Sequence, residues 1–145
     1  MNHLLKKFWK WLNITPEEYA RCGVSQRNGE AEENYDYFAE LLVFARSVID
    51  EGLTDNSSID DMLTILALDN ESESVLEYIE ENCSDKQLSI ILKKGLSHLQ
   101  PEARWQLAEL IYRRRPENYY SLLLKLAEDN HFYVRQRAGN CLELL

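Results

Sequence analysis

Apolar residues recur along most of this chain with the period of an α-helix. The first such stripe predicts a helix over residues 3–12, and its members are Leu5, Phe8, Trp9 and Leu12. Thr15 and Glu18 then form a capping box around Pro16, which predicts the start of a short helix. We expect this second helix to end at about Cys22.

A long helix is expected over residues 30–51, after a loop over residues 23–29. Its apolar stripe consists of Phe38, Leu41, Leu42, Ala45, Val48 and Ile49. The acidic residues of its first turns suit the positive end of the helix dipole. Gly52 stands where a left-handed C-terminal cap is expected.

From residue 57 the pattern changes to short helices with very short connections. We expect these helices over residues 57–68, 71–82, 85–97, 101–114, 117–128 and 131–144. A capping box at Ser84 and Gln87 marks one start, and Pro101 and Pro116 each fit a first helical position. Short helices joined by tight turns are typical of antiparallel pairs stacked in order.

The second half of the chain repeats itself. The matching segments are 66–70 with 126–130, at a shift of 60, and 103–107 with 134–138, at a shift of 31. In this register Leu107 corresponds to Ala138 and Ile111 to Leu142, so each pair should occupy equivalent buried positions. Both shifts indicate a unit of 30 to 31 residues. Each unit would be a helix pair that buries its apolar faces by stacking on its neighbours.

Residues 129–138, with the sequence DNHFYVRQRA, resemble the start of the second helix of a HEAT-like repeat. That motif implies a turn carrying Asp129, followed by Val134 and Arg135 and then a small residue. Residues 100–104 repeat the motif more weakly, with Arg104 at the arginine position. In similar repeats this arginine makes contacts between units. The resemblance implies an all-α, short right-handed solenoid of HEAT-like antiparallel helix pairs.

The size of the chain favours one domain. Its 145 residues, 45% of them hydrophobic, can form one core and are few for two. Only 5 Gly and 3 Pro disfavour a β-rich fold with many tight turns. We therefore expect a single helical domain, in which residues 57–145 form the HEAT-like pairs. Residues 1–56 match no family pattern and would form a divergent N-terminal helical cap.

Several features favour a cytoplasmic protein. No apolar run approaches the roughly 18 residues that a membrane span needs. The lysines of residues 1–13 are interleaved with apolar residues, unlike those of a secretory signal. Cys22, Cys83 and Cys141 lie far apart and are odd in number, which suits reduced thiols. Cys83 and Cys141 follow apolar helical positions and are expected in the core.

The net charge of −9 is unevenly distributed. Residues 29–85 carry −16, with seventeen acidic residues against Arg46, whereas residues 1–28 carry +3 and residues 86–145 carry +4. Such a block attracts cations or basic surfaces. We expect an exposed partner-binding surface here, and its candidate residues are Glu33, Tyr35, Asp36, Tyr37, Glu73, Glu77, Glu80 and Glu81. Tyrosines among charges are common interface anchors.

Two other interpretations of this acidic block stay open. The carboxylates can form a merely solvated helix face, and some of the tyrosine rings can belong to the core. The carboxylates of residues 69–80 also fit the spacing of a calcium loop. Ser74 stands where that loop needs glycine, however, and the repeat register makes the segment a helix. We therefore expect no calcium site.

The chain carries no recognisable catalytic constellation. His3, His98 and His131 lie far apart and lack metal-ligand spacing. No glycine-rich phosphate loop and no nucleophile signature is present. We expect no enzyme activity, no cofactor, no metal and no small-molecule substrate. His131 is expected to cap the last helix.

Basic residues gather at both ends of the chain. The C-terminal group consists of Lys93, Lys94, Arg113, Arg114, Arg115 and Lys125. Its arginines end a predicted helix, where cations suit the dipole. The basic first helix, with Trp9 and Trp11, fits either a membrane surface or a cap over the first unit. We favour the cap.

Together these features predict an acidic protein that binds and neutralises a basic protein, as an immunity protein does against a nuclease-type toxin. A nuclease has a cationic substrate groove, which an acidic helical protein can cover after fast, electrostatically steered association. HEAT-like helical proteins occur among such antitoxins. A scaffold or adaptor subunit of a larger assembly is the alternative. Nucleic-acid binding is a third class, which the charge of −9 disfavours unless the C-terminal basic residues form one contiguous face.

Overall fold

The computed structural model describes residues 1–22, 32 and 34–145, and this part of the chain is all-α, without strands. Its nine helices are α1 (His3–Leu12), α2 (Pro16–Arg21), α3 (Phe38–Asp50), α4 (Asn56–Leu68), α5 (Ser74–Asn82), α6 (Asp85–Gly95), α7 (Pro101–Arg114), α8 (Tyr119–Leu126) and α9 (Phe132–Glu143). Within the described ranges, no helix is long and apolar enough to cross a membrane.

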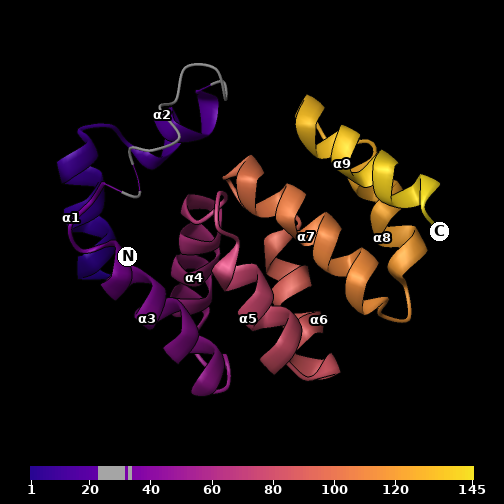
Figure 1. Ribbon diagram of the computed structural model, residues 1–145, viewed down its shortest axis with the longest axis horizontal. Coiled ribbons are helices and arrows are strands. Elements are labelled where there is room, and N and C mark those ends of the chain that lie inside the picture. Colours follow the sequence, from indigo (N-terminus) through magenta and orange to yellow (C-terminus); the bar gives the residue numbers. More distant parts are fainter. Residues whose placement is uncertain (23–31, 33) are drawn as a thin grey trace.

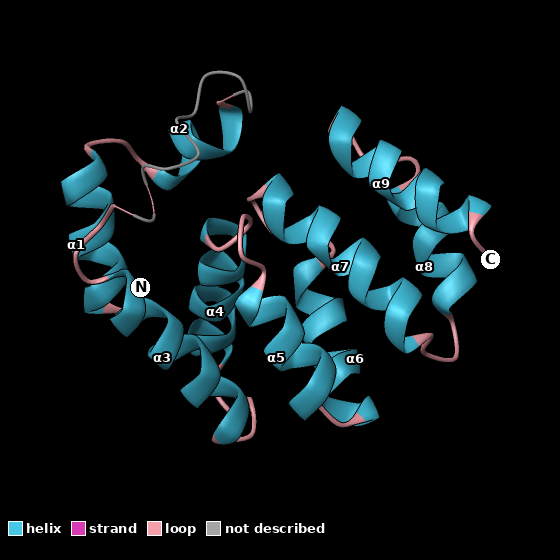
Figure 2. Ribbon diagram, viewed as in Figure 1, coloured by secondary structure: helices cyan, strands magenta, loops and turns pink. Residues whose placement is uncertain are grey.

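Most of the helices lie in two rows. α3, α5, α7 and α9 form a front row in Figure 1, and each contacts the next. α4, α6 and α8 lie behind this row in the same view. α1 packs on α3 at one end of the molecule, and α9 lies at the other end. Figure 2 shows that short loops join the successive helices from α3 onward.

α4 and α7 form the centre of the core. Every residue from Asp61 to Asp69 is buried, and so is every residue from Gln100 to Ile111 except Glu109. A helix that is buried on all sides must be mainly apolar all round, as residues 62–68 of α4 are. α4 packs directly on α7 as well as on α6. The α4–α7 contact differs from the predicted arrangement, in which helix pairs stack strictly in chain order, because it joins helices that are three elements apart.

The predicted 31-residue register between α7 and α9 is confirmed for one of its two residue pairs. The two helices lie side by side and run in the same direction (Figure 1). Leu107 and Ala138 are both fully buried. Ile111 is fully buried, while Leu142 is half-buried at the edge of the core. The equivalent positions therefore face the same interior.

The predicted helix over residues 30–51 is wrong at its start, because α3 begins at Phe38 and residues 34–37 form turns. The Tyr35 ring is buried instead against Phe8, with 5.3 Å between the ring centroids. Burying such a ring is worth about 1.5–3 kcal/mol. A carboxylate at a helix N-terminus gains only about 0.3–1 kcal/mol, which is less than burial of the ring provides. The predicted loop at 23–29 and Glu33 lie outside the described residues.

The start of α5 also differs from the prediction of 71–82, because α5 begins at Ser74. Asp69 is buried, and its Oδ2 accepts hydrogen bonds from the Val75 N–H (2.9 Å) and from Ser74 Oγ (2.8 Å). Glu73, between them, has a left-handed φ of 54°. Asp69 thus caps α5 from beyond the usual capping position and folds residues 69–73 into a turn.

Candidate functional site

Part of the acidic block holds the fold together. The Glu32 carboxylate is buried and accepts a hydrogen bond from the Tyr19 hydroxyl. The Asp61 carboxylate accepts one from the Asn2 N–H at 2.8 Å, which ties the start of α1 to α4. Burial raises the pKa of Asp61. These carboxylates are internal and do not face a partner.

Glu80 is also engaged within the chain. It lies on the side of α5 that faces α7, where its Oε2 is 3.0 Å from Arg113 Nη1. Arg113 Nε is 3.1 Å from Glu109 Oε1, and Glu109 Oε2 is 3.6 Å from Arg137 Nη2. Alternating charges thus join α5, α7 and α9. Glu80 is half-buried, and so is Glu73, so the prediction that both are exposed is wrong.

The three tyrosines of the acidic block have different roles. Tyr35 is 7% exposed and belongs to the core, and burial raises the pKa of its hydroxyl. Tyr78 is half-buried and donates a hydrogen bond to Asp50 Oδ1 at 2.6 Å, which joins α5 to α3. Tyr37 is 58% exposed. Only Tyr37 is placed as an interface anchor would be.

A smaller group of candidates remains on the outer side of α3 and α5. We call it the acidic face, and its residues are Asp36, Tyr37, Glu40, Val43, Glu77 and Glu81, all of them exposed. Glu40 and Val43 are about one turn apart and share one side of α3, and Asp36 lies in the turn just before this helix. On α5, Glu77 and Glu81 lie between the side that meets α3 through Tyr78 and the side that meets α7 through Glu80. Both helices therefore present carboxylates outward.

Two side chains in the acidic face are larger and less polar than solubility requires. Val43 is 60% exposed and Tyr37 58% exposed, and Glu40 is three positions from each of them. The Tyr37 ring also meets the buried Tyr35 ring edge-on, with 5.8 Å between centroids. This contact restrains the exposed ring, so that binding would cost it little side-chain entropy. An exposed tyrosine among charged side chains is typical of protein interfaces.

The C-terminal arginines serve the fold. Arg114 donates hydrogen bonds to the carbonyl oxygens of Glu80 (2.9 Å) and Cys83 (2.8 Å), so it caps the end of α5. The Arg115 guanidinium lies over the Tyr112 and Tyr119 rings, at 5.4 and 5.8 Å from their centroids. Arg113 pairs with Glu80 and Glu109, so all three arginines are engaged within the fold. The predicted structural role is confirmed, although Arg114 caps α5 and not its own helix.

The lysines of the same group differ from the arginines. Lys94 donates a hydrogen bond to the Asn56 carbonyl oxygen at 3.2 Å. Lys93 and Lys125 are exposed, and neither joins an ion pair with any described residue. Both line a groove of about 360 Å³ between α6 and α8. Sequence reasoning did not find this groove, because α6 and α8 are about thirty residues apart in the chain.

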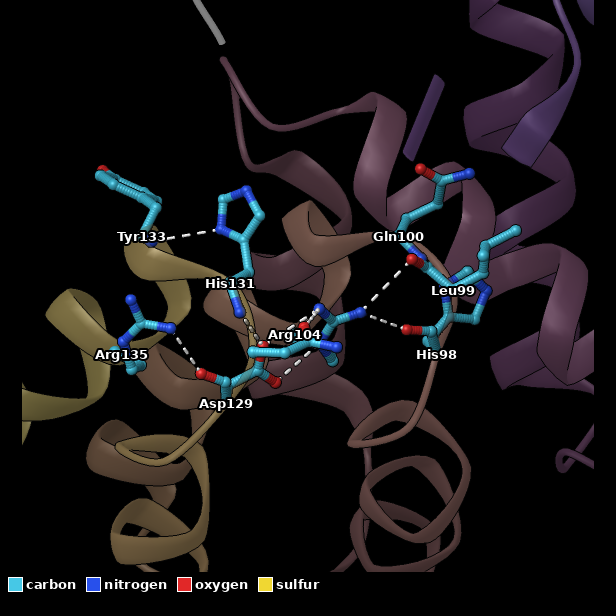
Figure 3. Close-up of polar contacts among 9 residues, drawn as sticks. His98, Leu99, Gln100, Arg104, Asp129, His131, Tyr133 and Arg135 are labelled. Carbon is cyan, nitrogen blue, oxygen red and sulfur yellow. Dashed lines mark hydrogen bonds and ion pairs between the residues drawn. The ribbon is translucent and has the colours of Figure 1, made fainter. Parts of the chain in front are cut away.

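Figure 3 shows a buried polar junction around Arg104. Arg104 Nε lies 2.8 Å from Asp129 Oδ2, and its Nη1 donates to the His98 carbonyl oxygen at 2.5 Å. Arg135 Nη1 donates to the backbone oxygen of Asp129 at 2.8 Å. His131 Nδ1 accepts from the Tyr133 N–H at 3.2 Å, which confirms its predicted capping role. The junction links the turn before α7 to the turn before α9.

No group of three or more His, Cys, Asp or Glu side chains is placed to hold a metal in the ranges that the structure describes. Cys83 and Cys141 are buried, as predicted, and burial raises the pKa of Cys83 to about 11. Its thiol is therefore protonated at neutral pH and is a poor nucleophile. His98 is 6% exposed, and desolvation lowers its pKa.

The first helix turns its apolar side inward. Leu5, Phe8 and Trp9 are buried, and Trp9 meets the Tyr19 ring with 5.4 Å between centroids. Trp11 alone of the predicted aromatic pair is exposed, at 46%. A membrane-surface helix needs its whole apolar side free for lipid. The arrangement supports the expected cap.

Comparisons of this chain with protein-family models, with curated proteins and with solved structures find no match.

Proposed function

We propose that this chain is a non-catalytic protein-binding module that uses its acidic face to bind a basic protein. In this proposal the partner is a nuclease-type toxin, which the chain neutralises in the cytoplasm as an immunity protein. The observation that carries the proposal is the exposure of Tyr37 and Val43, at 58% and 60%, among exposed carboxylates. Tyrosines are enriched among the residues that anchor protein interfaces.

Electrostatics supports a basic partner. The carboxylates of Asp36, Glu40, Glu77 and Glu81 are exposed and form no hydrogen bond or ion pair with the described residues. Their field is available to steer a cationic surface and raise its association rate. A nuclease must expose cations to hold its nucleic-acid substrate. Covering those cations would block the substrate without any chemistry by this chain.

The proposal includes an architecture. The helices after residue 56 would be HEAT-like pairs of a short right-handed solenoid, with the helices before it as a divergent cap. The Arg104–Asp129 pair supports this, because it joins consecutive units through the arginine of the repeated motif. The direct packing of α4 on α7 makes such a solenoid more compact than a regular stack of pairs.

An adaptor that joins two partners is the second candidate function. It is favoured by the groove between α6 and α8, which carries Lys93 and Lys125 and no carboxylate among its lining residues. An immunity protein needs only one binding surface. An adaptor would use this groove and the acidic face together.

Affinity capture followed by an activity assay tests the proposal. The wild-type chain and a variant with Tyr37→Ala and Val43→Ser would be compared as baits in an extract of the source cells. A basic protein retained by the wild-type chain alone would then be assayed for nuclease activity with and without added chain. Inhibition at equal molar ratio supports the proposal. Equal capture by the two baits, or full nuclease activity in the complex, contradicts it.

A further inference from the structure

The groove between α6 and α8 is a consequence of how the rear row packs. Both helices pack on α7, but they barely contact each other. Leu92 from α6, Leu96 from the turn that ends α6, and Leu122 from α8 line the space between them. Leu96 and Leu122 are half-buried, so the groove keeps part of an apolar floor in contact with solvent.

The charged residues that line this groove are all positive. Lys93 stands on the α6 wall and Lys125 on the α8 wall, both exposed. The remaining lining residues are uncharged, and they are Ser89, Leu92, Leu96, Ser97, Pro116, Asn118 and Leu122. In a chain with a net charge of −9, this is a local reversal of sign. The nearby arginines are engaged by other groups, whereas these two lysines are available to a ligand.

We infer that this groove binds a short acidic segment of a partner protein that carries leucine-type side chains. From Ser89 to Gly95 the α6 wall is about 9 Å long at 1.5 Å per residue, which is less than two helical turns, and Leu96 and Ser97 extend it as a turn. Apolar side chains of the segment would cover Leu96 and Leu122. Its carboxylates would pair with Lys93 on one side and Lys125 on the other.

A nucleic acid fits this groove less well than an acidic peptide does. Single-stranded nucleic acids bind aromatic platforms and tracks of several cations. This groove has three leucines on its floor, no aromatic lining residue and two lysines. The net charge of −9 also repels a polyphosphate more strongly than it repels a short peptide.

A synthetic peptide of about ten residues provides the probe, with two leucines four positions apart and glutamates at the other positions. Its binding to the full chain would be measured by fluorescence anisotropy at low salt. Lys93→Glu with Lys125→Glu should weaken binding about tenfold or more. The matched control, Lys10→Glu with Lys86→Glu, changes the net charge equally at exposed helical positions outside the groove. It should weaken binding by no more than about twofold.

Two further measurements locate the peptide. Methyl NMR signals of Leu96 and Leu122 should shift on titration, and a peptide with glutamine in place of glutamate should bind about tenfold more weakly. Equal loss in the two lysine variants, equal binding of the glutamine peptide, or shifts confined to other helices would overturn the inference.

Displacement of the peptide by oligo(dT) at lower concentration would assign the groove to nucleic acid. Self-association that depends on Lys93 and Lys125 would assign it to a second copy. None of these variants alters the acidic face, so the two proposals can fail separately.

Discussion

Arg104 on α7 pairs with Asp129, in the turn before α9, through two nitrogens on one edge of its guanidinium. Arg104 Nε lies 2.8 Å from Asp129 Oδ2, and Nη2 lies 3.1 Å from Oδ1. The two side chains are only 11% and 10% exposed, so little water screens them. The pair therefore joins α7 to the turn before α9.

Replacing Arg104 with alanine should destabilise the fold by about 3–5 kcal/mol, because Asp129 would remain as a buried charge without its partner. Urea unfolding followed by circular dichroism measures this change. Arg135→Ala is the control, since Arg135 is exposed and donates one hydrogen bond to the Asp129 backbone oxygen. The control should lose about 1 kcal/mol or less. Equal losses in the two variants would show that the junction is not structural.

Two helical glycines should respond in opposite ways to alanine. A Cβ at Gly95 would overlap Leu107 Cδ1 and lie 3.3 Å from Leu63 Cδ2, so Gly95→Ala should cost about 1–3 kcal/mol. A Cβ at Gly139, on α9, would meet nothing within 4 Å. Gly139→Ala should therefore stabilise the chain by about 0.5–1 kcal/mol. Melting temperatures of the two variants would measure both effects. A higher melting temperature for Gly95→Ala than for wild type would refute the close packing of α6 on α7.

His98 should make the folded chain sensitive to mild acid. Its Nδ1 accepts a hydrogen bond from the Gln100 N–H at 3.0 Å, and Nε2 lies 3.3 Å from Thr64 Oγ1 and 3.5 Å from Asp60 Oδ1. Desolvation lowers the pKa of His98, with Asp60 opposing and Arg104 adding to this effect. As pH falls through about 6.5, the unfolded chain binds the proton first and stability is lost. Above that pH, the His98 imidazole is neutral in both the folded and the unfolded chain, so it no longer changes the stability.

Comparing wild type with His98→Gln isolates the effect of His98 protonation on the free energy of unfolding. Between pH 7.5 and 5, the unfolding free energy of wild type should fall relative to that of the variant by at most about 1.4 kcal/mol per pH unit. His3→Gln, at an exposed position, should keep the wild-type profile. Parallel profiles for wild type and His98→Gln would contradict the assignment.

Most of the helices and the α7–α9 register could be predicted from the sequence, because local signals mark them. Ser84 and Gln87 form the predicted capping box, with hydrogen bonds in both directions. Gly52 has the expected positive φ of 95°. Leu107 and Ala138 are buried as the repeat requires. Spacing along one helix is sufficient to find each of these features.

The features missed by the sequence analysis depend on contacts between distant residues. Tyr35 is in a turn because its ring packs on Phe8, across a sequence gap that no periodicity spans. Glu80 pairs with Arg113, which lies thirty-three positions away. The sequence alone therefore gives the acidic block and the basic group as separate surfaces, although Glu80 and Arg113 join them in the fold. The acidic face is consequently narrower than the predicted surface and extends onto Glu40 and Val43.

Tyr37 should be the anchor of the acidic face. Replacing it with alanine should accelerate dissociation of the captured partner about thirtyfold, which corresponds to roughly 2 kcal/mol. Surface plasmon resonance would measure this rate. Tyr120→Ala is the control, because Tyr120 is also 56% exposed but lies on α8. Equal dissociation rates for wild type and Tyr37→Ala would remove Tyr37 from the interface.

Charge reversal tests whether the acidic face steers and binds the basic partner. Glu40, Glu77 and Glu81 are exposed on the acidic face, and Glu117, Glu128 and Glu143 are exposed nearer the C-terminus. Reversing either triplet to lysine changes the net charge equally. The association rate with the captured partner would be measured by stopped flow at low and moderate salt. Reversal on the acidic face should slow association about tenfold or more at low salt, and added salt should shrink the difference. A wild-type association rate for this variant, or an equal slowing in the C-terminal one, would contradict the account.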